Sequence, residues 1–290
     1  MIKKILLSVI FIIIVNLWIH PVAHALQSTI TESEGYACMG NDKSRKQTET
    51  EALADAKRKA VDNASTYIRS ETHVKDLQLE KDLIDAYANA TITIVQELGK
   101  SWYNDQMSGD CFKIKIKAEV IPDDKAMASI SKGSGTSDDP NTPLYVQLWT
   151  EKKEYKRSEK IKIYMKGNKP FYVRVLYKDV KGNILQLLPN PYRNDNYFNG
   201  GVIYEIPSGR DNFELEVNPP FGEESIIFYA SPSQLGEISL SDAGGVYQVK
   251  TGMKDIGIST RGIKIKEKSD DKVAPVSEFY EGKLNIKTEK

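Results

Sequence analysis

The sequence predicts an α+β domain, in which two helices lie on a small antiparallel sheet, followed by an all-β sandwich-like domain. Two observations predict the first domain. Alanine recurs every four residues over 52–64, the period of an amphipathic helix, and residues 112–120 alternate strictly, the period of a strand. One observation predicts the second: after residue 142 the chain becomes a series of short β-rich runs separated by polar turns.

The first 25 residues predict an export signal. A basic start, Met1–Lys4, precedes a 15-residue apolar run from Ile5 to Ile19, and Ala23-His24-Ala25 has the small residues that a signal peptidase reads. We expect cleavage after Ala25 and a periplasmic or secreted bacterial protein without a transmembrane segment in its mature form. An uncleaved anchor is the alternative, but the apolar run is shorter than the roughly 20 residues of a bilayer span.

The helices of the first domain, residues 27–122, follow from spacing. Thr48 and Glu51 are three residues apart, as in a capping box, which predicts that the first helix begins there. Its alanine face over 52–64 would let it lie close to a sheet. A second helix is expected over 77–90, where apolar residues recur.

Three strands complete this domain, in the order β, α, α, β, β. They are expected over residues 32–39, from residue 91 onward, and over residues 112–120 after a turn at Gly109. In the last of them Ile, Ala and Val alternate with Lys, which predicts an apolar inner face and lysines outside. The lysine stripe could bind a polyanion, but a solvated face whose lysines oppose aggregation is the favoured interpretation.

Two cysteines, Cys38 and Cys111, predict one disulfide. It would tie the first strand, or the loop after it, to the start of the last strand, and would contribute on the order of 4 kcal/mol in the chain-entropy model. A redox pair or half of a metal site is the alternative. Redox motifs place their cysteines close together, however, and the chain has no further Cys.

The rest of the chain divides by composition. Residues 123–142 are predicted to be a flexible linker, because 131–141 consist almost wholly of Gly, Ser, Thr, Asp, Pro and Asn. Residues 143–267 are the predicted β-sandwich domain. Residues 268–290 form a polar tail, in which apolar residues around 279–286 could add a final strand.

Charge and histidine content exclude several classes of function. Without Lys3 and Lys4 of the signal the chain has 38 basic and 40 acidic side chains, a balance that provides no general attraction to nucleic acid. His20 and His24 belong to the signal, so His73 is the one histidine of the mature chain. His-dependent catalysis and common zinc sites are therefore not expected. We predict no catalytic residue, cofactor or metal, while chemistry by carboxylates alone stays open.

One segment stands out as a candidate ligand loop between strands. It combines a Pro-Asn-Pro turn with aromatic, amide and charged side chains, which suit contact with a carbohydrate or a peptide. Its candidate residues are Asn190, Tyr192, Arg193, Asn194, Asp195, Asn196, Tyr197 and Phe198. The alternative, which we favour, is a long loop stapled by its own aromatic side chains.

Residues 143–231 resemble a bacterial domain of unknown function, number 4384. The resemblance lies in Leu187-Leu188-Pro189-Asn190, in Gly200-Gly201 followed by Tyr204-Glu205-Ile206-Pro207, and in Asn218-Pro219-Pro220-Phe221-Gly222 before a hydrophobic strand. It extends to Val146–Thr150 and implies a secreted or envelope-associated β domain. The family brings no established catalytic residues.

Residues 27–122 resemble, more weakly, the N-terminal module shared by the flagellar H-ring protein FlgT and small LPP-type outer-membrane lipoproteins. The likeness lies in residues 52–61, in Ser70-Glu71-Thr72 and in the closing strand, Ile114–Val120. The lipidation cysteine of the LPP-type lipoproteins is absent.

These observations predict an exported, non-enzymatic binding or scaffold protein of the bacterial cell envelope. Its partner would be an envelope protein or a glycan. Two alternatives stay open: a carboxylate-based hydrolase of envelope polysaccharide, and an assembly component of a surface organelle, comparable to the flagellar H-ring.

Overall fold

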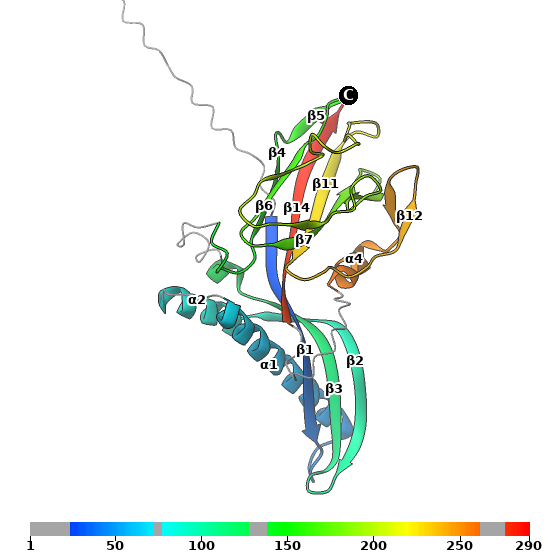
Figure 1. Cartoon of the computed structure of the whole chain (residues 1–290). Coiled ribbons are helices and arrows are strands. Elements are labelled where there is room, and N and C mark those ends of the chain that lie inside the picture. Colours follow the sequence, from blue (N-terminus) through cyan, green and yellow to red (C-terminus); the bar gives the residue numbers. More distant parts are fainter. Residues whose placement is uncertain (1–23, 72–76, 128–137, 262–275) are drawn as a thin grey trace, which may run out of the picture.

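The computed structural model describes residues 24–71, 77–127, 138–261 and 276–290 (Figure 1). Among the described residues strands predominate and helices are few. Residues 1–23 of the predicted signal, His73 and residues 128–137 of the predicted linker lie outside the described residues.

The first part of the chain has the predicted order β, α, α, β, β. Its elements are β1 (His24–Cys38), α1 (Arg45–Glu71), α2 (Leu77–Ala88), β2 (Thr91–Asp105) and β3 (Gly109–Ile121). Strand β1 begins earlier than expected, at His24, because residues 24–31 pair with β14, whereas β2 begins at Thr91 as predicted.

Helix α1 lies close to the sheet because the residues at their contact have small side chains or none (Figure 1). The four alanines of its repeat are fully buried: Ala52, Ala56, Ala60 and Ala64. On β1, Gly35 faces them, and a Cβ atom at Gly35 would stand only 2.1 Å from the carbonyl oxygen of Ala52. A side chain at Gly35 would therefore push the helix away from the strand.

The capping box of α1 is not the predicted one. Thr48 lies inside the helix and is buried. The reciprocal bonds join Ser44 and Gln47: the Gln47 amide donates to Ser44 Oγ at 3.3 Å and the Ser44 amide donates to Gln47 Oε1 at 2.8 Å. Both pairs have the same spacing, and the helix starts at the earlier one.

The second part of the chain is built almost entirely of short strands. They are β4 (Val146–Thr150), β5 (Glu154–Lys156), β6 (Ile163–Gly167), β7 (Phe171–Lys178), β8 (Ile184–Leu188), β9 (Tyr197–Phe198), β10 (Tyr204–Ile206), β11 (Glu223–Ser231), β12 (Leu240–Asp242), β13 (Tyr247–Val249) and β14 (Val276–Glu289), with a short helix, α4 (Met253–Thr260), before the last. Strands β10, β6 and β4 form a separate three-stranded sheet. The others join one large sheet in the order β12-β13-β8-β7-β11-β14-β1-β3-β2, with β5 paired to β14 and β9 to β7.

Strand β14 connects the two halves of the chain. It pairs antiparallel with β11 on one side and with β1 on the other, so the sheet runs unbroken from the last part of the chain to the first (Figure 1). Residues 276–289 of the expected polar tail thus form a central strand rather than a final one at the edge. Its buried side chains, such as Phe279, Leu284 and Ile286, explain that position.

Three hydrophobic clusters hold this arrangement together. The first joins the three-stranded sheet to one face of β7, β11 and β14. The second lies between the helices α1 and α2 and strand β3. The third, on the opposite face of the large sheet, includes Ile256 of α4.

The end of the predicted linker, residues 138–142, is bound to the β domain. Asn168 Nδ2 donates to the carbonyl oxygen of Asp139 at 3.0 Å, and Lys166 Nζ lies 2.6 Å from Asp138 Oδ2.

The outer face of β3 is solvated along only part of its length. Lys113 and Lys115 are exposed and form ion pairs with Glu34 and Glu32 of β1, which leaves no free lysine stripe there. Further along, Lys117 and Glu119 are buried, contrary to the expected outward exposure. Arg261, which follows α4, covers Glu119 and lies 2.7 Å from its Oε1.

Candidate functional site

The candidate site is a pocket of about 390 Å³ between the two sheets. Its walls come from β6, β7, β8, β11 and β14 and from the segment 214–220. It lies toward the end of β14 that carries the C-terminus, the end marked C in Figure 1. A volume of this size lies in the range of small-molecule sites, roughly 300–1,000 Å³.

The walls are mainly apolar because the strands alternate. Ile163 of β6, Leu187 of β8 and Ile226 of β11 all line the pocket, and Ile163 and Ile226 belong to the core between the sheets. Ile163 and Ile226 occupy fully buried positions of their strands, and the half-buried Leu187 packs against the same core. The pocket is therefore an unfilled continuation of this core.

Three polar side chains on adjacent strands stand among the apolar walls: Glu224 of β11, Tyr177 of β7 and Thr288 of β14. Glu224 is 3% exposed and lies on the same face of β11 as Ile226. Thr288 Oγ1 donates to Glu224 Oε1 at 3.1 Å, and the Tyr177 hydroxyl also hydrogen-bonds to the Glu224 carboxyl. Burial raises the pKa of Glu224, and the nearby Asp179 charge raises it further against these hydrogen bonds.

Asp179 is the second acid of the pocket, and it is held in a turn after β7. Its Oδ1 accepts from the backbone amides of Lys181 and Asn183, and its Oδ2 accepts from Asn183 Nδ2 at 2.7 Å. Burial alone would raise the pKa of Asp179, but these hydrogen bonds lower it below its ordinary value. The environments of Asp179 and Glu224 thus shift their pKa values in opposite directions.

The pocket is electrostatically one-sided. Its lining includes Asp179, Glu214, Glu216 and Glu224 but, among the described residues that form it, no Lys, Arg or His. Glu214 pairs at the exposed rim with Lys160, at 2.5 Å. No described Lys or Arg forms an ion pair with the other three acids. Uncompensated negative charge therefore borders an apolar space.

One residue of the predicted ligand loop, Tyr192, contacts sequence neighbours of the pocket lining. Tyr192 is 54% exposed and its ring stacks on Phe213, at 6.1 Å between centroids. Phe213 directly precedes the lining residue Glu214. The Tyr192 hydroxyl also packs against Gly245, whose neighbour Val246 lines the pocket. Tyr192 is thus near the pocket, but none of the candidate loop residues is among the described residues that line it.

Other residues of the loop are committed to local structure. Asn190 Oδ1 accepts from the amides of Tyr192 and Arg193, both at 2.8 Å, and Asn190 Nδ2 donates to the carbonyl oxygen of Leu187. Arg193 pairs with Asp211 at 3.0 Å and lies over the ring of Phe198. Phe198 is buried in the core between the sheets. These contacts match a loop stapled by its own side chains.

The remaining loop residues do not converge on one point. Asn194 and Asp195 are exposed, and Asp195 Oδ1 accepts from the Tyr197 amide. The Asn196 carbonyl oxygen accepts from the Val173 amide at 2.8 Å. Tyr197 packs on Tyr172, with ring centroids 4.8 Å apart.

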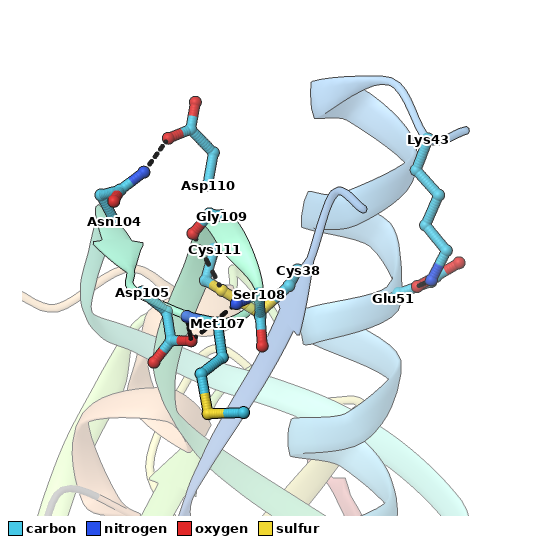
Figure 2. Close-up of a disulfide and its surroundings, with 10 residues drawn as sticks. All are labelled: Cys38, Lys43, Glu51, Asn104, Asp105, Met107, Ser108, Gly109, Asp110 and Cys111. Atoms are coloured by element: carbon cyan, nitrogen blue, oxygen red, sulfur yellow. Dashed lines mark hydrogen bonds and ion pairs between the residues drawn. A yellow bond between two sulfur atoms is a disulfide. The ribbon is translucent and has the colours of Figure 1, made fainter. Parts of the chain in front are cut away.

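The predicted disulfide joins Cys38 and Cys111, which lie directly opposite each other on β1 and β3. Figure 2 shows it beside the turn between β2 and β3, where Asp105 Oδ1 accepts from the amides of Met107 and Ser108. Neither cysteine lines the pocket. The bridge therefore links β1 to β3 in the first part of the chain and is not part of the candidate site.

The comparisons with known proteins bear on the region that forms most of the pocket. Residues 154–234 match the family model of a domain of unknown function, DUF4384. No curated protein and no solved structure matches the chain. The DUF4384 region agrees with the resemblance over residues 143–231, whereas the likeness to FlgT is not shown.

Most of the pocket belongs to the DUF4384 region. Tyr177, Asp179, Glu214, Glu216 and Glu224 all lie within it, and β14 adds Ile286 and Thr288 from outside. Sequence reasoning missed these residues. One signal could have indicated Glu224: it stands two positions before Ile226 and four before Phe228, at an inward position of an otherwise apolar strand.

No group of three or more His, Cys, Asp or Glu side chains within the described ranges could hold a metal ion. In the same ranges no helix has both the length and the apolar character needed to cross a membrane.

Proposed function

We propose that this protein is an exported, non-enzymatic binding or scaffold protein of the bacterial cell envelope, and that its DUF4384 region is a sandwich-type module that holds a ligand in the pocket between the two sheets. The observation that carries the proposal is the apolar pocket of about 390 Å³ with a few convergent polar groups. Binding sites of small ligands commonly combine these two properties.

Location in the envelope is the part of the proposal that rests on sequence. It is supported by the predicted signal of residues 1–25 and by the Cys38–Cys111 bridge, since disulfides persist mainly in oxidising compartments. Fractionation of the native bacterium tests it. The protein is expected in the periplasm or the medium, beginning at Leu26, and recovery from the cytoplasm with its first residues intact would contradict export.

Binding in the pocket is tested with a neutral apolar fluorophore and the mature protein. The fluorophore should gain intensity on binding, and Val246→Trp should abolish the gain, because Val246 lines the pocket yet is 37% exposed and can accept a large side chain. Val202→Trp is the matched control: Val202 is 44% exposed and lies outside the pocket lining. Equal binding by both variants would contradict the proposed site.

A second candidate function is hydrolysis of envelope polysaccharide by carboxylates. It is favoured by the opposite pKa shifts of Asp179 and Glu224 in one pocket, the pattern of an acid and base pair. The apolar lining favours binding over this alternative, because polysaccharides need many polar contacts. Turnover of purified cell-wall glycan that is lost in Glu224→Gln and in Asp179→Asn would establish the hydrolase; no turnover by the wild-type protein would eliminate it.

A further inference from the structure

We infer that the inter-sheet pocket accepts a small amphiphile with an apolar body and a cationic head, the head meeting Glu224 and Asp179. This inference deepens the proposed function and rests on it. It names the chemical class of the ligand that the binding module would hold.

The apolar body follows from the lining. Ile163, Leu187, Ile226 and Ile286 surround the space from both sheets, and no described basic side chain enters it. Burying apolar surface here contributes roughly 25 cal/mol for each Å² removed from water. An apolar chain or ring is therefore the part of a ligand that gains most from this volume.

The cationic head follows from the acceptors. A carboxylate has about four lone-pair sites. The Glu224 carboxyl accepts hydrogen bonds from two protein donors, Thr288 and Tyr177. It is only 3% exposed, yet some of its lone-pair sites are left for a donor on a ligand. Asp179 adds a second negative charge on the same wall.

The surrounding charges make a cation the complementary choice over an anion. Lys160 forms an ion pair with the lining residue Glu214 at the exposed rim, so its charge is already paired. An anionic head would meet Asp179, Glu216 and Glu224 without a described basic residue of the lining to receive it. Like charges placed together in a partly desolvated site disfavour binding.

The test uses three probes with the same ten-carbon chain: decyltrimethylammonium, decanoate and 1-decanol, each below the concentration at which it aggregates. Displacement of the neutral fluorophore from the wild-type mature protein measures their affinities. The cation should bind about tenfold more tightly than the alcohol, and the carboxylate more weakly than both. Equal affinities, or a preference for decanoate, would overturn the inference.

Variants assign the preference to its residue. Glu224→Gln keeps the shape of the side chain and should reduce the preference for the cation over the alcohol by about tenfold while the alcohol still binds. The matched control is Glu223→Gln, which removes the same charge from the adjacent exposed position of β11 and should keep the preference. A cation preference that survives Glu224→Gln, in protein with wild-type circular dichroism, would contradict the assignment.

The outcomes for the inference and for the proposed function are separate. If all three probes bind with equal affinity and Val246→Trp abolishes binding, the pocket is a ligand site and the cationic head is wrong. If none of the probes binds, or if binding is unaffected by Val246→Trp, the proposed function fails as well. The probe comparison on the wild-type protein needs no variant to fold.

Discussion

At the scale of single residues, Glu224 shows how one side chain changes the character of a core. The other inward side chains of β11 in the core between the sheets are apolar. The Glu224 carboxyl group is hydrogen-bonded to Thr288 and Tyr177 and lies near the charge of Asp179. Burying a carboxylate costs free energy that burying a carboxylic acid does not. Such a residue is expected at a site rather than in a core that serves stability alone.

The stability of the protein should depend on pH through Glu224. Because its pKa is raised above the ordinary value of 4.5 in the folded state, its stabilising contribution is fully present below pH 4.5 and is lost as the pH rises through the folded-state pKa. The free energy of unfolding of Glu224→Gln, relative to wild type, should therefore increase from pH 4 to pH 7.

Urea denaturation at the two pH values measures this difference. Glu223→Gln reports the effect of losing one exposed carboxylate from the same strand. A relative stability of Glu224→Gln that falls between pH 4 and pH 7 would contradict a raised pKa.

At the scale of elements, the contact between α1 and β1 depends on the absence of a side chain at Gly35. An added Cβ atom would come within 2.1 Å of the Ala52 carbonyl oxygen and 2.3 Å of the Ala56 amide nitrogen, both backbone atoms that move only with the helix. Gly35→Ala should lower the free energy of unfolding by about 2 kcal/mol, as overpacked substitutions do. Gly99→Ala on β2, with no atom within 4 Å, is the matched control, and chemical denaturation compares the two.

The disulfide is a second feature at this scale, and it holds β1 to β3. It spans 73 residues of sequence, so replacing Cys38 and Cys111 by Ser should lower the free energy of unfolding by about 4 kcal/mol. Chemical denaturation of the oxidised protein and the double variant measures the loss, and reduction of the wild type should reproduce it. Mass spectrometry of the protein from its native compartment should find the bridge; two free thiols there would contradict it.

At the scale of the whole molecule, the last strand of the chain joins the two parts of the large sheet. β14 lies between β11 and β1, and Phe279 and Leu284 on it belong to two different hydrophobic clusters. The sheet that joins the two halves can thus be completed only after residues 276–289 have been synthesised.

Removal of residues 276–290 should therefore affect both halves. We expect the amides of β1 and of β11 to lose protection from hydrogen exchange together, because each loses its ladder with β14. Hydrogen exchange read by mass spectrometry distinguishes the two strands. If β1 keeps its wild-type protection in the shortened protein, the first part of the chain is stable without the last strand.

The sequence by itself determined the elements with strong local signals. The alanine period predicted α1, the alternation of residues 112–120 predicted β3, and the two cysteines predicted their bridge. The start of α1 was placed four residues too late, at Thr48 instead of Ser44, because two segments have capping-box spacing and local pattern does not rank them. In each of these cases the determining residues are close in sequence or, for the bridge, unique in type.

Only the tertiary structure decided where these elements meet. The position of β14 between β11 and β1 depends on pairing across most of the chain, and the strand's own pattern is the same at the edge of a sheet as at its centre. The burial of Glu119 depends on Arg261, 142 residues away, and the pocket depends on side chains from five strands and a loop. The periodicity of the sequence specifies which face of a strand is apolar. A site depends instead on how far apart the faces of different strands lie, and that distance is set by the packing of segments that are distant in sequence.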